Sequence, residues 1–195
     1  MFNLMEGRYT IILLPEGSLG RIISKIRDDL QNLTKRPSVP AHITLREDFF
    51  SKDIDKFIEE FKDKISGLKP LKLKFTNIEV FQRGHVVYKV ENKSELQKLH
   101  EITVKTSQKY VSTPRIRTFE CELNEEQKEI VKKYQLPFYF KYYTPHMTIV
   151  RLNEFKDKEK ILELINEYDI PTEFNISNVC IYDKLKHKIY QLIKL

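Results

Sequence analysis

The chain is poor in the residues that several common enzyme classes require. It has only two cysteines, Cys121 and Cys180, whose separation matches no zinc site and favours a reducing compartment, for which we expect the cytoplasm. Its five glycines form no phosphate-binding P-loop and no Gly-x-Ser-x-Gly elbow. A His-Glu-x-x-His segment and a tight acidic cluster are missing too. We therefore expect neither a metal ion nor another cofactor.

Long apolar runs are also missing. No segment approaches the roughly 20 apolar residues that span a bilayer, and Glu6, Gly7 and Arg8 interrupt the layout of a signal peptide. Of the 195 residues, 41% are hydrophobic and 32% are charged, which is typical of a soluble protein with a real core. The net charge of +6 favours an anionic partner such as a nucleotide or RNA, although it decides nothing alone. We expect a monomer that binds no membrane.

The apolar periodicity predicts an α+β fold. Strands are expected at 8–14, around His42 and His146, and at 71–81, 85–91, 173–182 and 188–195. Helices are expected at about 18–33, 51–67, 94–110 and 156–168. Asn124 and Gln127 have the spacing of a capping box, which predicts a further short helix to about Tyr134.

The predicted elements repeat. The order strand, helix, strand, helix, strand occurs at about 8–81 and again at about 85–182, followed by a last strand to 195, and residues 76–81 resemble residues 177–182. The second copy carries an extra segment at about 111–140. We therefore expect one bilobal domain over residues 1–195, with a duplicated two-lobe fold. Antiparallel sheets would line a central cleft, with helices outside.

Two short segments share one pattern. His42-Ile43-Thr44-Leu45 and His146-Met147-Thr148-Ile149 each alternate a polar with an apolar residue. Successive side chains of a strand point to opposite faces, so each histidine shares a face with its threonine while the apolar residues enter a core. The repeat predicts that the two pairs face each other across the cleft.

Two histidines and two hydroxyls are suited to chemistry on a phosphodiester. Cleavage needs a base for the attacking oxygen and an acid for the leaving oxygen, and imidazole can serve as either near neutral pH. The hydroxyls of Thr44 and Thr148 could stabilise charge on the phosphoryl oxygens. Arg46 continues the face of His42, so we predict a phosphate contact there, with a solvated arginine as the alternative. Arg151 has the wrong parity unless its strand bulges.

The extra segment mixes basic and aromatic residues just before His146. Aromatic rings can stack on bases, and Tyr142 and Tyr143 are the candidates that lie closest to the motif. The alternative is that these side chains simply pack on the lobe. Basic residues of the segment include Arg115, Arg117, Lys132 and Lys133.

The paired motifs on a duplicated α+β scaffold resemble the two-histidine (2H) phosphoesterase superfamily, which includes RNA 2′,3′-cyclic phosphodiesterases once named 2′-5′ RNA ligases. The resemblance implies metal-free hydrolysis of a 2′,3′-cyclic phosphate or a 2′-5′ linkage, with His42 and His146 catalytic and Thr44 and Thr148 binding phosphate. The extra segment departs from the family pattern and leaves the substrate open.

Three alternatives stay open from the sequence. The enzyme could degrade 2′-5′ oligoadenylate or a cyclic oligonucleotide signal. It could be an RNA- or nucleotide-binding module without turnover. It could also join RNA ends, since the reverse reaction would use the same residues.

Overall fold

The computed structural model describes residues 6–35, 37, 39–114, 118–119 and 122–195. Its strands are β1 (Gly7–Leu13), β2 (Thr34–Lys35), β3 (Ile43–Ser51), β4 (Leu71–Phe81), β5 (His85–Val90), β6 (His146–Leu152), β7 (Glu173–Ile176), β8 (Asn178–Asp183) and β9 (Lys188–Lys194). Its helices are α1 (Leu19–Asp29), α2 (Ile54–Ile65), α3 (Ser94–Gln108), α4 (Glu125–Tyr134) and α5 (Lys158–Asn166), with short 3₁₀ turns η1 (Gln82–Gly84), η2 (Phe140–Tyr142) and η3 (Phe155–Asp157).

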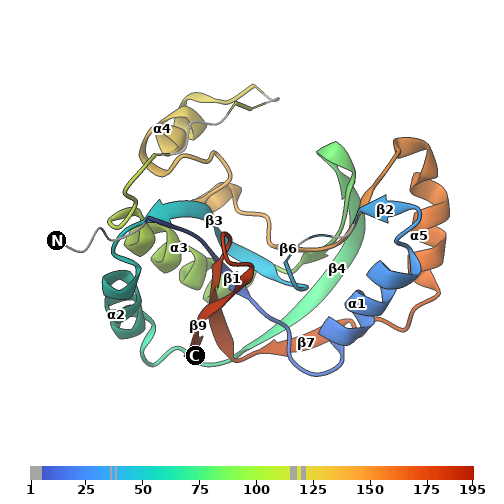
Figure 1. Ribbon diagram of the computed structural model, residues 1–195, viewed down its shortest axis with the longest axis horizontal. Helices are drawn as coiled ribbons and strands as arrows, with labels where there is room; N and C mark the ends of the chain where they lie inside the picture. Colours follow the sequence, from blue (N-terminus) through green and yellow to red (C-terminus); the bar gives the residue numbers. More distant parts are fainter. Residues whose placement is uncertain (1–5, 36, 38, 115–117, 120–121) are drawn as a thin grey trace.

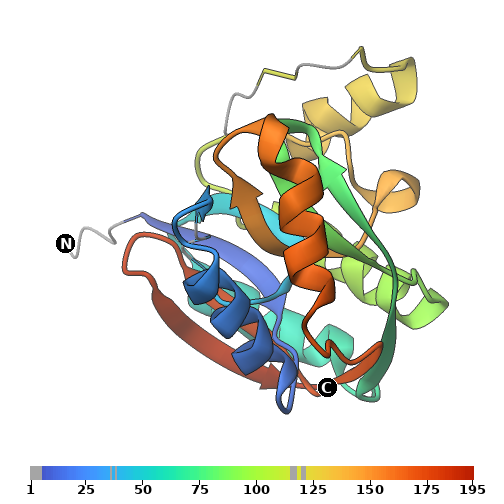
Figure 2. The ribbon, with the colours of Figure 1, turned by 90° about the vertical axis from the view of Figure 1, so that its right-hand side faces the viewer.

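The strands form one curled antiparallel sheet in the order β7-β4-β5-β6-β3-β1-β8-β9, with β2 paired to β6. The helices lie outside it: α1 and α5 lie together at one end of the molecule, and α2 and α3 lie at the other (Figures 1 and 2). The predicted α+β class with antiparallel strands and outer helices is therefore confirmed, although the sheet is continuous.

Two predicted elements differ from the structure. The first helix ends at Asp29, and Thr34 then pairs with Leu152 of β6. The strand expected at 173–182 is two strands, because β7 pairs with β4 at one end of the sheet while β8 pairs with β1 at the other. One straight strand cannot pair at both ends of a curled sheet, so the strand is interrupted between Ile176 and Asn178.

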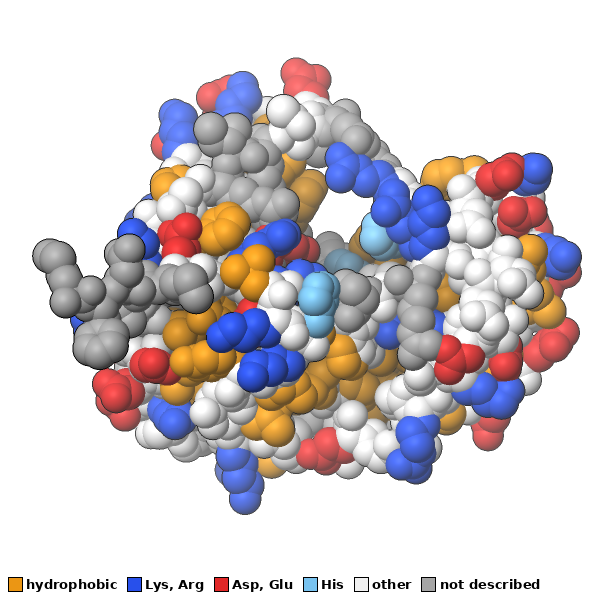
Figure 3. Space-filling model, in the orientation of Figure 1, with side chains coloured by type: hydrophobic (Ala, Val, Ile, Leu, Met, Phe, Trp, Pro, Cys, Tyr) orange, Lys and Arg blue, Asp and Glu red, His pale blue; other side chains and the backbone are white. Residues whose placement is uncertain are grey.

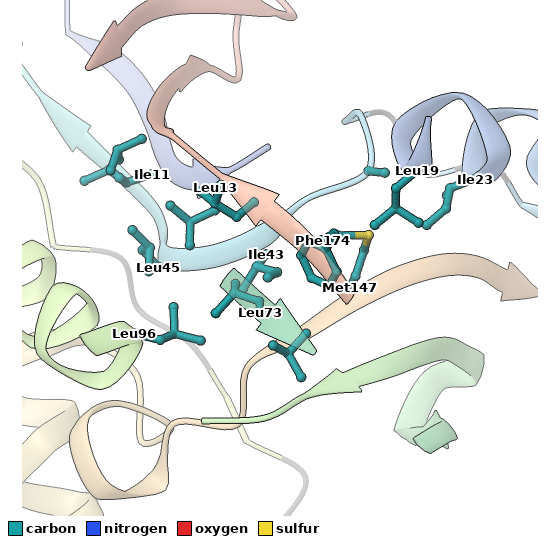
Figure 4. Close-up of a cluster of buried hydrophobic side chains, with 14 of the residues drawn as sticks. Ile11, Leu13, Leu19, Ile23, Ile43, Leu45, Leu73, Leu96, Met147 and Phe174 are labelled. Atoms are coloured by element: carbon teal, nitrogen blue, oxygen red, sulfur yellow. The ribbon is translucent and has the colours of Figure 1, made fainter. Parts of the chain in front are cut away.

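The apolar faces of the sheet and helices meet in one main core. Ile43 and Met147, the inner residues of the two motifs, have no exposed surface, and they pack with Leu13, Leu19 and Phe174 in this cluster (Figure 4). Burial of this kind fixes the face that each strand turns outward, because a shift of one residue would expose the whole apolar set. None of the helices in the described ranges has the length and apolar character needed to cross a membrane.

Candidate active site

The two His-x-Thr segments lie side by side in the middle of the sheet. β3 and β6 are antiparallel neighbours whose pairing is centred on Ile43 and Met147. That register sets Thr44 opposite His146 and His42 opposite Thr148, on the face away from the core. The threonines and histidines are all half-buried. The sequence predicted that the motifs, 104 residues apart in the chain, face each other across a cleft; the structure places them on neighbouring strands of one sheet.

Both imidazoles are oriented in the same way. Nδ1 of His42 donates to the carbonyl oxygen of Pro40 at 2.6 Å, and Nδ1 of His146 donates to that of Thr144 at 2.8 Å. A carbonyl can only accept, so the proton of each neutral ring sits on Nδ1. Nε2 of each ring has no hydrogen-bond partner among the described residues. Two imidazole nitrogens are therefore left for a ligand or a reacting group.

The charged groups that act on His42 are all positive. Burial lowers the pKa of His42 to about 4, and the positive charges of Arg27, Lys184 and His146 act in the same direction. The hydrogen bond to Pro40 opposes them without cancelling them. His42 is therefore neutral at pH 7, and its surroundings favour an anion. The ring of Phe81 packs edge-on against His146, with 4.9 Å between the ring centroids.

Arg27 of α1 supports the second motif from behind the sheet. Its Nε donates to the carbonyl of Ile149 and its Nη2 to that of Thr148, both at 2.8 Å, and its Nη1 donates to Val39 at 3.0 Å. The side chain is only 3% exposed. One guanidinium thus holds the backbone at Thr148 and also the loop that leads to His42.

His100 and Tyr143 support the first motif. The hydroxyl of Tyr143 donates to the carbonyl of Thr44 at 2.9 Å, and Nδ1 of His100 donates to that of Leu45 at 2.8 Å. The two rings stack with 3.7 Å between their centroids. Nε2 of His100 accepts from the backbone N–H of Phe140 at 3.1 Å, so His100 links β3 to η2.

Sequence reasoning missed Arg27 and His100, although a signal was present. Arg27 lies four residues after Ile23 on the apolar stripe of α1, and His100 lies four residues after Leu96 on that of α3. A polar residue at a core position of a helix must find a partner inside the protein. Here the partners are strand carbonyls next to the motifs.

Arg46 was predicted to bind phosphate, and the structure corrects this prediction. The pairing of β3 with β1 shifts register twice between Thr44 and Phe49, so the strand bulges and Arg46 is buried with 1% of its surface exposed. Its Nη1 donates to the carbonyl of Tyr134 at 3.0 Å and its Nη2 to Oε1 of Gln108 at 3.1 Å. Arg46 ties β3 to α3 and α4 instead of facing the cleft.

Arg151, unlike Arg46, lies on the exposed face of its strand. The pairing of β6 with β5 shifts register between Thr148 and Val150, which buries Ile149 and Val150 together and returns Arg151 to the exposed face of His146. Sequence parity had ranked Arg151 below Arg46. The bulge reverses that order, because it moves every following side chain of β6 to the other face.

The two tyrosines proposed for base stacking make contacts within the protein. Tyr143 stacks on His100 and donates to the carbonyl of Thr44, so it positions β3; burial raises the pKa of its hydroxyl. Tyr142 is bound to Asn124 at 3.0 Å, at the start of α4. The predicted capping box between Asn124 and Gln127 is confirmed. Arg115 and Arg117 lie outside the described residues.

A cavity of about 500 Å³ adjoins the first motif. Its walls include Leu14, Pro40, Ala41 and Tyr182, so it borders the two residues that precede His42. Pockets of this size and apolar lining are suited to small organic groups. Within the described ranges, no three His, Cys, Asp or Glu side chains gather as metal ligands.

Comparisons with known proteins find a matching family model and solved structures of similar fold. The model of the 2′-5′ RNA ligase superfamily matches residues 15–188. The crystal structure of E. coli LigT in apo form has a TM-score of 0.54 at 13% identity, with 97% of this chain and 95% of LigT covered. LigT complexed with 3′-AMP gives 0.52 at 14% identity, with 92% and 88% covered.

A eukaryotic structure has the same fold. Usb1 from Kluyveromyces marxianus gives a TM-score of 0.50 at 9% identity, with 97% of this chain and 98% of Usb1 covered. Identities this low show a shared fold only. No curated protein is similar enough in sequence to count as a match.

Proposed function

Because this chain belongs to the 2′-5′ RNA ligase superfamily, we propose that it is a metal-independent phosphodiesterase. Its substrate is a 2′,3′-cyclic phosphate or a 2′-5′ phosphodiester in RNA or a nucleotide. The observation that carries the proposal is the pair of half-buried imidazoles on neighbouring strands, each with Nδ1 bound to its own backbone and Nε2 without a protein partner.

His42 acts as the base in this proposal. Its lowered pKa of about 4 keeps it neutral, so the Nε2 lone pair can take a proton from the attacking water. The water oxygen then bonds to phosphorus, and the bond from phosphorus to the 2′ or 3′ oxygen breaks. His146 gives the Nε2 proton of its imidazolium to that leaving oxygen. The product is a phosphate monoester, and solvent restores the two protonation states.

Thr44 and Thr148 bind the phosphate in this proposal. Each hydroxyl lies opposite the histidine of the other strand, so the two donors flank the same space between the rings. Donors fixed in place before the reaction stabilise the charge that grows on the phosphoryl oxygens. Their backbones are held from behind by Tyr143 and Arg27, which limits movement of either donor.

The test compares three histidine variants on 2′,3′-cyclic nucleotides. His42→Ala and His146→Ala should each lower turnover by about 10²- to 10⁴-fold, whereas His187→Ala, at an exposed turn before β9, should keep the wild-type rate. EDTA should leave the wild type active. Strong inhibition by EDTA, or full activity in either site variant, would overturn the proposal.

Two further measurements separate the roles. An NMR titration of His42 should show a midpoint near 4 with the proton of the neutral ring on Nδ1; a neutral ring with its proton on Nε2 would reject His42 as the base. Tight binding of a 2′-phosphorylated nucleotide without hydrolysis between about pH 5 and pH 9 would identify a binding module instead of an enzyme.

A further inference from the structure

The cavity of about 500 Å³ beside the first motif borders the face of the sheet that carries Thr44. Ile12 of β1 lies opposite Thr44 of β3 on one side and opposite Cys180 of β8 on the other, so the three side chains share one face. Tyr182 lies two residues after Cys180, so it points to the same face, and it lines the cavity. The cavity therefore adjoins the same surface as the two motifs.

The loop before His42 forms another wall of the cavity. Pro40 and Ala41 both line it, and the carbonyl oxygen of Pro40 accepts the hydrogen bond from Nδ1 of His42. Leu14, a further lining residue, directly follows the residue of β1 that pairs with Ile43. The same short loop thus shapes the cavity and orients the ring of His42.

The lining of the cavity suits an uncharged ring better than a phosphate. Leu14, Val39 and Tyr182 supply apolar side chains that pack in one small cluster. Among the described residues of the lining, Arg27 is the one charged side chain, and its guanidinium already donates to three backbone carbonyls. Apolar walls with few polar groups are typical of sites for flat organic rings.

Positive charge gathers next to the histidines. Burial and then the positive charges of Arg27, Lys184 and His146 lower the pKa of His42, so these charges lie close to its ring. Figure 3 shows Lys and Arg side chains gathered along the edge of a hollow, next to a histidine. These charges favour an anion beside the imidazole, outside the apolar lining of the cavity.

Tyr182 adds a free polar group to the apolar lining. The residue is 4% exposed, and its hydroxyl has no hydrogen-bond partner in the described part of the chain. Nε of Arg46 is the one fully buried side-chain nitrogen or oxygen without a partner among the described residues, so the hydroxyl of Tyr182 must reach open space. Burial raises the pKa of this hydroxyl, which therefore stays protonated near neutral pH and can donate. Buried tyrosine hydroxyls usually have a partner, so this donor is left for a ligand.

We propose that this cavity binds the base of the nucleotide whose phosphate reacts between the histidines. The base contacts the apolar side chains of the lining, and the hydroxyl of Tyr182 donates to a ring nitrogen or a carbonyl oxygen of the base. The ribose joins the base to the reacting phosphate, so one nucleotide occupies both places. This proposal rests on the proposed function for the position of the phosphate.

The experiment compares kcat/KM for two substrates that share one reacting group. These are adenosine 2′,3′-cyclic phosphate and methyl riboside 2′,3′-cyclic phosphate, which carries a methoxy group in place of the base. The wild type should prefer the nucleotide by about tenfold or more, because the base buries apolar surface and gains a hydrogen bond. Equal kcat/KM for the two substrates would overturn the proposal and leave the proposed function standing.

Gly20 of α1 allows the cavity to be filled by a substitution. It lines the cavity, and a Cβ atom added there meets no other atom within 4 Å. Gly20→Phe should occupy the space of the base, so it should lower kcat/KM for the nucleotide far more than kcat/KM for the methyl riboside. Arg21→Phe adds the same ring at the next position, which is exposed and outside the lining, and should keep the wild-type preference. A full preference in Gly20→Phe would overturn the proposal.

Tyr182→Phe keeps the ring in its cluster and removes only the hydroxyl. The preference for the nucleotide should fall by about two- to tenfold, since one hydrogen bond to the base is lost. Tyr190→Phe is the matched control, because its hydroxyl donates to Asp55 at 2.8 Å, and it should keep the wild-type preference. An unchanged preference in Tyr182→Phe would overturn the hydrogen bond that we assign to this hydroxyl.

Failure of the proposed function gives a different result. If neither substrate is hydrolysed, the binding of adenosine alone, measured by calorimetry, tests the cavity without any phosphate. Binding to the wild type and to Arg21→Phe that is lost in Gly20→Phe would support the cavity as the site of the base. Equal binding to all three proteins, or no binding to the wild type, would overturn it.

Discussion

The two halves of the candidate site have matching backbones and different supports. One charged side chain, Arg27, binds the carbonyls behind the second motif, whereas two neutral side chains, His100 and Tyr143, bind those behind the first. In both strands a bulge follows the threonine and disturbs the regular ladder. In both, the donor comes from the buried face of a helix that precedes the other motif in the chain: Arg27 of α1 for the second motif and His100 of α3 for the first.

This difference shows that the support of each motif depends on where its strand carbonyls lie and not on one type of side-chain donor. A strand that bulges must still satisfy its buried carbonyls, and any well-placed donor can do so. The exposed sides also differ, because the residue after each bulge is Glu47 in β3 and Arg151 in β6. The cleft is therefore more basic beside His146 than the similarity of the motifs suggests.

The largest effect should come from Arg27, which serves three carbonyls. Arg27→Met leaves all of them without this donor in a buried place, so we expect the free energy of unfolding to fall by about 3 to 5 kcal/mol. Urea denaturation measures this. Arg21→Met, at an exposed position of the same helix, should cost less than about 0.5 kcal/mol. Equal losses in the two variants would show that the contacts of Arg27 do not support the site.

The free energy of unfolding should depend on pH through His100, which supports the first half of the candidate site. Burial lowers the pKa of His100 to about 4, so the unfolded chain takes up a proton at higher pH than the native protein does. This contribution to stability is present above the unfolded pKa of about 6.5 and is lost as pH falls toward 4. Because the ring of His100 has no exposed surface, this contribution to the free energy of unfolding amounts to about 3 kcal/mol.

His100→Gln isolates that contribution. Glutamine can donate to Leu45 and accept from Phe140 without titrating in this range. The loss of unfolding free energy between about pH 7 and pH 4 should therefore be smaller in the variant than in the wild type. If both proteins lose the same amount, His100 does not make the first half sensitive to acid.

Local patterns account for what the sequence could predict. The helices, the two motif strands and the capping box of α4 follow from periodicities and spacings within a few residues. The bulges depend on how a strand pairs with a distant partner, and no local pattern records that. For this reason, the alternation of side chains along a regular strand gave the wrong face for Arg46 and Arg151. The prediction of one unbroken strand at 173–182 was wrong for the same reason.

The smallest effect should come from Tyr143→Phe, which removes only the hydroxyl that binds Thr44. The ring can still stack on His100, so we expect a loss of about 1 kcal/mol in unfolding free energy. Tyr142→Phe is the matched control, because its hydroxyl binds Asn124 at an exposed helix start. If the carbonyl contact also positions Thr44, Tyr143→Phe alone lowers kcat/KM; an equal drop in Tyr142→Phe would argue against this role.

In a double-mutant cycle, Tyr143→Phe and His100→Gln should be non-additive by at least about 0.5 kcal/mol, because their rings are in direct contact and bind consecutive carbonyls. Additive losses would mean that the two side chains hold β3 independently. The first half would then resemble two separate contacts, in contrast to the single guanidinium that holds the second.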